Sequence, residues 1–226
     1  MRETWEDVCK NSDLECALFN GDWQTFTRMF DLIMKDPEQY SYIIPHPGEW
    51  HWNWHILKAI YKIWCEYLLR PLSQVLKFKN LDAKCANFHY GEDFLEIVTI
   101  ALADFVCELR ELHPGMTYLA IMHHYKPNSH MYELLYMYLW HICPYWHTRA
   151  ALKSNMPTVI NQYWRYWLHA FIACCKSNHA IMTMRFLWLL RFLNPDLVKV
   201  INENCIFSFS SDKDTGIPLD GVNELV

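Results

Sequence analysis

The segment Tyr40–Leu69 (YSYIIPHPGEWHWNWHILKAIYKIWCEYLL) combines the two patterns from which the fold class can be predicted. Its first residues, Tyr40–Ile44, are an aromatic and β-branched run that is typical of a short strand. His46–Gly48 is a turn signal. From Glu49 onward the segment is rich in apolar residues, and we expect a long helix that ends before Pro71. The segment therefore predicts a strand, an acidic residue and a helix in direct succession.

The preceding part of the chain has the same order of patterns. Leu14–Phe19 (LECALF) indicates a short buried strand, and Asn20-Gly21 is a turn signal. Asp22 follows directly, and its carboxylate is suited to accept hydrogen bonds from the free backbone N–H groups at the start of a helix. We expect that helix over Trp23–Lys35. The first 70 residues thus contain two strand–acid–helix units.

The rest of the chain is predicted to be helical almost throughout. From Glu92, apolar residues recur at the spacing of one helix face; they are Phe94, Ile97, Val98, Ala101, Leu102 and Phe105. Further helices are expected at about 129–142, 159–175, 180–192 and 196–203. A polar loop follows at 208–216, and Asp220 is positioned to cap a further helix that the end of the sequence truncates. We therefore predict one domain over 1–226, with strand–acid–helix units at 1–70, a helical portion at 71–207 and a loop with a truncated terminal helix at 208–226.

Composition supports a mainly α fold with a small β component. Apolar residues make up 52% of the 226 residues and charged residues 20%, so the chain can bury a sizeable core. Only six glycines are present, which disfavours a turn-rich β-sandwich. The nine cysteines are scattered, without a Cys-x-x-Cys pair. Most lie in apolar helical runs, as Cys65 and Cys107 do, which is typical of small buried thiols in a reducing compartment. The sequence has no signal peptide and no long apolar run, so we expect an intracellular protein, nuclear or cytoplasmic, without membrane contact.

The two acids that follow the predicted strands are the first candidates for chemistry. Asp22 and Glu49 would lie at neighbouring strand ends, and clustered carboxylates there can hold the divalent ions that activate water for nucleic-acid cleavage. Such a site needs a further acid, for which Glu224 is the candidate. For Asp22, simple helix capping is the alternative interpretation. The formal net charge of −5 does not support DNA binding, because phosphate contacts normally require a basic surplus.

Histidines provide a second set of candidate metal ligands. His51 and His55 are four residues apart in the predicted helix, a spacing at which two imidazoles can share a metal. The alternative is an aromatic-rich helix whose histidines bond their neighbours. His141, Cys143 and His147 allow a similar hypothesis, against which a histidine-stabilised helix end is the plainer interpretation. The stretch Trp164–Trp167 (WRYW) could stack bases around Arg165, although a buried aromatic face is the better prediction.

Several blocks of the sequence, in their order, resemble the domain-of-unknown-function family 6589. The blocks are GDWQT (Gly21–Thr25), IIPHPGEWHWNWHILKAIYKIW (Ile43–Trp64), NFHYGEDFLEIV (Asn87–Val98), INQYWRYWLHAF (Ile160–Phe171), NHAIMTMRFLWLLRFLNP (Asn178–Pro195) and GIPLDGVNEL (Gly216–Leu225). The resemblance spans nearly the whole chain. It implies a transposon-derived protein whose fold is a truncated ribonuclease H-like α/β core carrying a large helical portion.

The resemblance also implies roles for single residues. Asp22 matches the acid of the family's Gly-Asp block. Glu49 and His51 match its acid–Trp–His block, in which Asp is more usual than Glu, and Glu224 matches the glutamate after the Ile-Pro-x-Asp motif. These residues would hold Mg²⁺ or Mn²⁺ in a DNA-cleaving and strand-transfer core. We find no counterpart of the Asp-Asn block of fuller members, so the chain is expected to be incomplete and inactive alone.

Two other functions stay open at the level of the sequence. One is a non-catalytic helical interaction scaffold that binds a protein partner or a second copy of itself. The other is a metal-binding protein that uses histidines such as His51 and His55.

Overall fold

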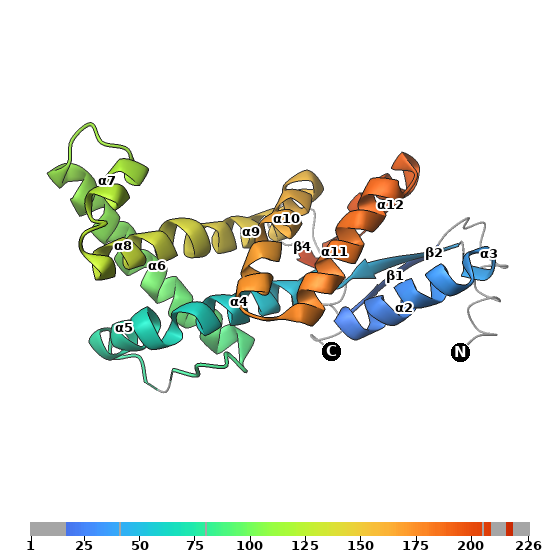
Figure 1. Cartoon of the computed structure of the whole chain (residues 1–226), viewed down its shortest axis with the longest axis horizontal. Coiled ribbons are helices and arrows are strands. Elements are labelled where there is room, and N and C mark those ends of the chain that lie inside the picture. Colours follow the sequence, from blue (N-terminus) through green and yellow to red (C-terminus); the bar gives the residue numbers. More distant parts are fainter. Residues whose placement is uncertain (1–16, 41, 80, 205, 209–215, 219–226) are drawn as a thin grey trace. The chain divides into compact units, whose positions relative to one another are not determined.

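The structure is a computed structural model that describes residues 17–40, 42–79, 81–204, 206–208 and 216–218. The described residues are mainly helical, with a small parallel strand pair near the start of the chain, which confirms the predicted mainly α fold with a small β component (Figure 1). Clustering of contacts divides the chain into two compact units. Unit 1 comprises Met1–Asn53 and Ala150–Val226, and unit 2 comprises Trp54–Arg149. Two compact units can be lobes of one domain, so the single-domain expectation stays a prediction.

The sheet of unit 1 pairs β1 (Ala17–Gly21) with β2 (Ile43–Pro47) in parallel. The register explains how a strand with two prolines can pair. Tyr42 accepts a hydrogen bond from the Ala17 N–H, and the Gly48 N–H donates to the Gly21 carbonyl. The backbone N–H and C=O groups of the even-numbered residues of β2 therefore point toward β1. The prolines at 45 and 47 are odd-numbered, so their missing N–H groups fall on the side away from β1, where a strand tolerates proline.

Both strands extend further toward the C-terminus than the sequence predicts. Asn20 and Gly21 belong to β1, where the sequence predicts a turn, and His46 and Pro47 belong to β2. The turn signals were misleading because the parallel partner supplies the hydrogen bonds that these residues would otherwise make within a turn. Each strand consequently runs almost directly into its acid.

The helices of unit 1 lie around this strand pair. They are α2 (Trp23–Lys35), α3 (Pro37–Tyr40), the first residues of α4 (Glu49–Trp64), α10 (Pro157–Ala173), α11 (Ser177–Phe192) and α12 (Pro195–Asn204). Helices α2 and α11 contact β2, and α12 contacts β1. A short antiparallel pair, β3 (Ile206–Ser208) and β4 (Gly216–Pro218), follows. The predicted helix after Asp220 lies outside the described residues.

Within its described residues, unit 2 consists of helices joined by loops. It contains the rest of α4, the π-helical segment η1 (Cys65–Leu69), α5 (Arg70–Val75), α6 (Phe88–Leu112), α7 (Tyr118–His124), α8 (Ser129–Met137), a second π-helical segment η2 (Tyr138–Ile142) and most of α9 (Cys143–Lys153). One core cluster consists of Val106, Leu109, Ile121, Met122 and Leu135. The predicted apolar face of α6 is buried at Phe94, Val98 and Leu102, whereas Ile97 is exposed.

The π-helical segments explain why two prolines do not end their helices. We expected Pro71 to close the long helix, but the chain continues as α5. In η1 the Arg70 N–H donates to Cys65, five residues back, and in η2 the Cys143 N–H donates in the same way to Tyr138. The N–H that closes each wider turn belongs to the residue directly before a proline, Arg70 before Pro71 and Cys143 before Pro144. A proline ring clashes with the carbonyl four residues back, and a wider turn is one way to relieve that clash.

No helix within the described ranges combines the length and apolar character that crossing a lipid bilayer requires.

Candidate functional site

The carboxyl ends of β1 and β2 place Asp22 and Glu49 after neighbouring strands, as the sequence predicts. Gly21 and Pro47 are paired in register, and the Gly48 N–H lies 2.5 Å from the Gly21 carbonyl oxygen. Asp22 comes directly after Gly21, and Glu49 directly after Gly48. This edge of the sheet is the candidate functional site.

Asp22 is the N-cap of α2. Its side chain accepts a hydrogen bond of 2.8 Å from the Thr25 N–H. Burial alone would raise the pKa of Asp22, but hydrogen bonds from Thr25, the positive potential of His51 and the Gln24 N–H together lower it below its ordinary value. A side chain at position 21 would clash with this cap, because a Cβ atom there would lie 2.7 Å from Thr25 Cγ2. The alternative interpretation, helix capping, therefore describes what Asp22 does in the structure.

Glu49 lies in the first turn of α4 and is only 2% exposed. Its Oε1 atom lies 3.8 Å from Nε2 of His46, which is 1% exposed. The other ring nitrogen of His46, Nδ1, lies 3.5 Å from Asn20 Oδ1, and the two residues are paired in register between the strands. The His46 ring also meets Phe186 edge-on, with centroids 5.0 Å apart. Glu49 thus ends a polar row, Asn20–His46–Glu49, in which His46 and Glu49 are buried and Asn20 is half-buried.

His46 is the residue of this row that the sequence analysis missed. The His-Pro-Gly order indicated a turn, in which the imidazole would face solvent. The available signal was the spacing between His46 and Glu49, three residues apart, where the end of a strand and the first turn of a helix bring side chains together. Asn53 lies one turn beyond Glu49 on α4, is 1% exposed, and makes no hydrogen bond with a described residue. The interior at this edge is therefore unusually polar.

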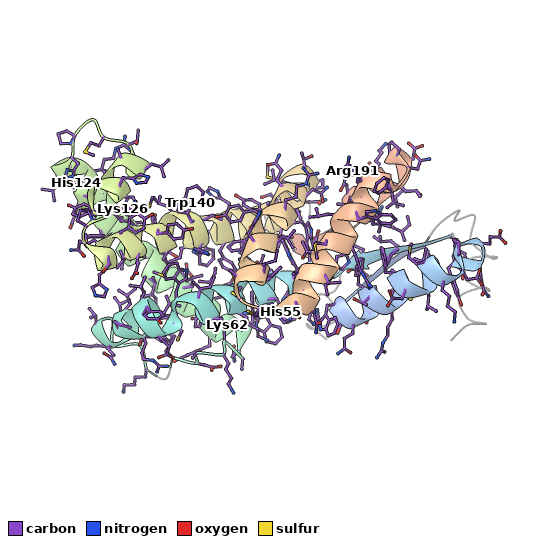
Figure 2. The ribbon with its side chains drawn as sticks, viewed as in Figure 1. His55, Lys62, His124, Lys126, Trp140 and Arg191 are labelled. Carbon is purple, nitrogen blue, oxygen red and sulfur yellow. The ribbon has the colours of Figure 1, made fainter. Side chains whose placement is uncertain are left out.

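The histidine pair His51 and His55 lies on α4 as predicted, with His55 shown in Figure 2. The His51 ring is edge-on to Trp50, with centroids 4.8 Å apart, and the His55 ring lies 6.4 Å from that of Trp54. Among the described residues, no three His, Cys, Asp or Glu side chains come together in a group that could hold a metal ion. The assignment of His51 and His55 as metal ligands stays a prediction, as does the role of Glu224, which lies outside the described residues.

A bound Mg²⁺ or Mn²⁺ ion does not fit Glu49 as the structure places it. A Mg²⁺ or Mn²⁺ ion that two carboxylates share usually keeps several water ligands, so water must be able to reach the carboxylate oxygens. Glu49 is enclosed next to His46, and one oxygen of Asp22 is already engaged by Thr25. We therefore derive no chemical step through a metal ion.

The predicted cluster of His141, Cys143 and His147 lies in unit 2. His141 belongs to η2, and its ring is edge-on to Trp64, with centroids 5.5 Å apart. Burial lowers the pKa of His141 to about 4 and raises the pKa of the Cys143 thiol. A histidine with this pKa is neutral at pH 7. In this uncharged form, the His141 ring packs against Trp64.

This burial predicts a loss of stability in acid. The pKa of His141 is lower in the folded chain than in the unfolded chain, so its contribution is present above about pH 6.5 and is lost as the pH falls toward 4. Between about pH 8 and pH 5 we expect His141 to account for about 2 kcal/mol of lost unfolding free energy. Urea unfolding of His141→Leu at both values should show a shallower pH dependence than the native chain. The exposed His130→Gln is the control, and an unchanged slope for His141→Leu would refute the assignment.

The aromatic stretch Trp164–Trp167 forms part of the core of unit 1. Trp164 and Trp167 are fully buried, and Trp164 stacks on Trp52 with ring centroids 3.9 Å apart and an interplanar angle of 22°. The prediction of a buried aromatic face is confirmed, and base stacking by these tryptophans is excluded by their burial. Arg165, between them in sequence, is exposed.

Comparisons with protein-family models, with curated proteins and with solved structures find no match for this chain.

Proposed function

We propose that this chain is a transposase-derived domain that acts as a non-catalytic interaction scaffold and does not cleave DNA on its own. The single observation that carries the proposal is the burial of Glu49. Its carboxylate is 2% exposed and lies beside the buried His46, at the position where a cleaving enzyme would need an accessible metal ligand. In this proposal the strand–acid–helix units are retained because they hold the fold together.

The ancestry part of the proposal is supported by the resemblance and by the parallel strand pair. Each of the strands β1 and β2 leads to an acid and a helix, so two carboxylates follow neighbouring strand ends, as we expect of a ribonuclease H-like core. Such a core has a larger sheet than the two strand pairs among the described residues. The overall charge of −5 also favours a protein partner over DNA. An intracellular location, nuclear or cytoplasmic, is part of the same proposal.

A nicking assay tests the proposal. Supercoiled plasmid is incubated with the purified chain and Mn²⁺ or Mg²⁺, and the relaxed form is quantified beside reactions with Asp22→Ala and Glu49→Gln. We expect all three proteins to leave the plasmid as intact as buffer does. Nicking by the native chain that both substitutions abolish would establish a catalytic core and overturn the scaffold proposal.

The structural role of Glu49 makes a separate prediction. Glu49→Ala removes the neighbour of the buried His46 ring and leaves a polar cavity, so we expect a loss of about 2 kcal/mol of unfolding free energy. The control is Glu96→Ala, an exposed glutamate on α6, which should change stability far less. Chemical denaturation at pH 7 measures both. Equal effects would show that Glu49 has no special role in folding.

A further inference from the structure

Two hollows on the surface of unit 1 meet at the C-terminal half of α11. The larger, of about 690 Å³, is lined by Arg165 of α10 and by Leu187, Trp188, Leu190, Arg191 and Phe192 of α11. The smaller, of about 230 Å³, shares Trp188 and Phe192 and is also lined by Phe30, Ile33, Met34 and Pro45. We call the two hollows together the α11 groove. Figure 2 shows Arg191 toward the C-terminal end of α11.

The apolar residues of the α11 groove are unusually exposed. Trp188 is 46% exposed, Phe192 64% and Met34 58%. Ile181 and Met184 lie seven and four residues before Trp188 and add exposed apolar side chains to the same face of α11. Met182 and Phe186 on another face are buried, and contiguous exposed apolar surface normally marks a binding site. We therefore expect an apolar surface of a binding partner to cover the α11 groove.

The charges at the groove indicate the chemistry of its occupant. Arg165 and Arg191 form no ion pair with any described residue. Arg185, by contrast, is neutralised, because its Nη1 atom lies 3.1 Å from Asp31 Oδ1. Two guanidinium groups without an ion pair among the described residues give this surface a local positive potential on a chain of net charge −5. Carboxylates are the natural partners of guanidinium groups next to an apolar contact.

We infer that the α11 groove binds an acidic amphipathic helix of a partner protein, in which an apolar anchor fills the smaller hollow and carboxylates pair with Arg165 and Arg191. This inference rests on the proposed scaffold function and gives that scaffold its partner class. The helix-in-groove mode needs apolar side chains at i, i+3 or i+4 and i+7 beside a charged edge. The groove provides the complementary features: an apolar hollow between α2 and α11, and basic residues along its other side.

Two other occupants fit the groove less well. A nucleic-acid strand would use the arginines and could stack on Trp188, but it has no aliphatic group for the smaller hollow. That hollow also has no basic residue among its described lining. A second copy of this chain, docked groove to groove about a two-fold axis, would bring Arg165 and Arg191 of both copies together, and like charges oppose such a contact.

A designed peptide of about 15 residues, long enough to be helical, is a suitable probe. It carries Leu, Leu and Trp at i, i+4 and i+7, Glu along one flank and a fluorescein label. Fluorescence anisotropy measures its affinity for the full chain. Trp188→Ala and the double substitution Arg165→Glu/Arg191→Glu should each weaken binding about tenfold or more, since aromatic and arginine anchors dominate such interfaces. Circular dichroism confirms that both variants are folded.

A charge-swap experiment distinguishes specific docking from nonspecific hydrophobic binding. A second peptide replaces each Glu with Lys, and it should bind the Arg165→Glu/Arg191→Glu chain better than the native chain. Four results would each overturn the inference. The acidic peptide could fail to bind, or the Lys peptide could fail to prefer the Arg165→Glu/Arg191→Glu chain. A labelled oligo-dT strand could bind more tightly than the acidic peptide, or the chain could form a dimer that Trp188→Ala abolishes. The plasmid assay has an independent readout, so a chain that binds no peptide and nicks no DNA would refute this groove without refuting the scaffold proposal.

Discussion

Trp164→Ala is expected to lower the free energy of unfolding by about 3–5 kcal/mol, because it removes the centre of the aromatic core of unit 1. Trp164 is fully buried and stacks on Trp52, with the two ring centroids 3.9 Å apart. Trp164 also meets Phe186, with ring centroids 5.0 Å apart and an interplanar angle of 63°. The substitution loses these ring contacts and leaves a cavity that the surrounding rigid rings cannot collapse to fill. Urea unfolding followed by circular dichroism measures the loss.

The matched control for Trp164→Ala is Trp188→Ala on the neighbouring helix α11. Trp188 is 46% exposed, so its removal should cost no more than about 1 kcal/mol. The pair compares the same substitution in a buried and in an open environment. If both variants lost the same stability, the stacked core of unit 1 would be contradicted. A mild effect of Trp188→Ala also qualifies this variant for the peptide-binding experiment.

Glu92→Ala is expected to cost about 3–4 kcal/mol, through a largely buried network in unit 2. Glu92 Oε1 accepts hydrogen bonds of 2.6 Å from both Arg149 Nε and the Tyr145 hydroxyl, and Oε2 accepts one of 2.9 Å from Arg149 Nη2. The side chains of Arg149 and Glu92 are 18% and 13% exposed. Removal of the carboxylate leaves the guanidinium of Arg149 without its counter-charge in a place that water reaches poorly, which is why the loss is large.

The chain supplies its own control for this network. Arg70 and Glu66 also form a bidentate ion pair, but their side chains are 45% and 65% exposed. Glu66→Ala should therefore have only a small fraction of the effect of Glu92→Ala, because water solvates the remaining charge. The double variant Glu92→Leu/Arg149→Met should regain much of the lost stability, since apolar packing can replace a buried ion pair. Equal losses for Glu66→Ala and Glu92→Ala would contradict the account.

Features set by short-range interactions could be predicted from the sequence. Asp22 caps α2 through Thr25, three residues away, so a local pattern was enough to predict both the cap and the helix. The helices after Glu92 follow from apolar spacing, and the burial of Trp164 and Trp167 follows from their three-residue separation on one helix. Burial of the thiols was predicted from their apolar helical runs, which is right for Cys65 and wrong for Cys107. Cys65, Cys85 and Cys174 are buried, whereas Cys107 and Cys175 are exposed.

Features that depend on distant segments could not be predicted in this way. The parallel register of β1 and β2 converts the turn signals at Asn20-Gly21 and His46-Pro47 into strand ends, and it thereby buries His46 beside Glu49. The α11 groove is lined by residues from helices far apart in the sequence, so no single sequence motif predicts it. The roles of Glu224 as a catalytic residue and of the histidines as metal ligands stay predictions.

Binding of Mn²⁺ tests the central claim most directly, namely that Asp22 and Glu49 serve the fold and not a catalytic metal ion. Electron paramagnetic resonance reports the concentration of free Mn²⁺ while the ion is titrated into the purified chain, into Asp22→Asn and into Glu49→Gln. We predict the same weak, non-stoichiometric binding by all three proteins. Stoichiometric binding by the native chain that is lost in both variants would contradict the account and would place a metal ion between the two strand ends.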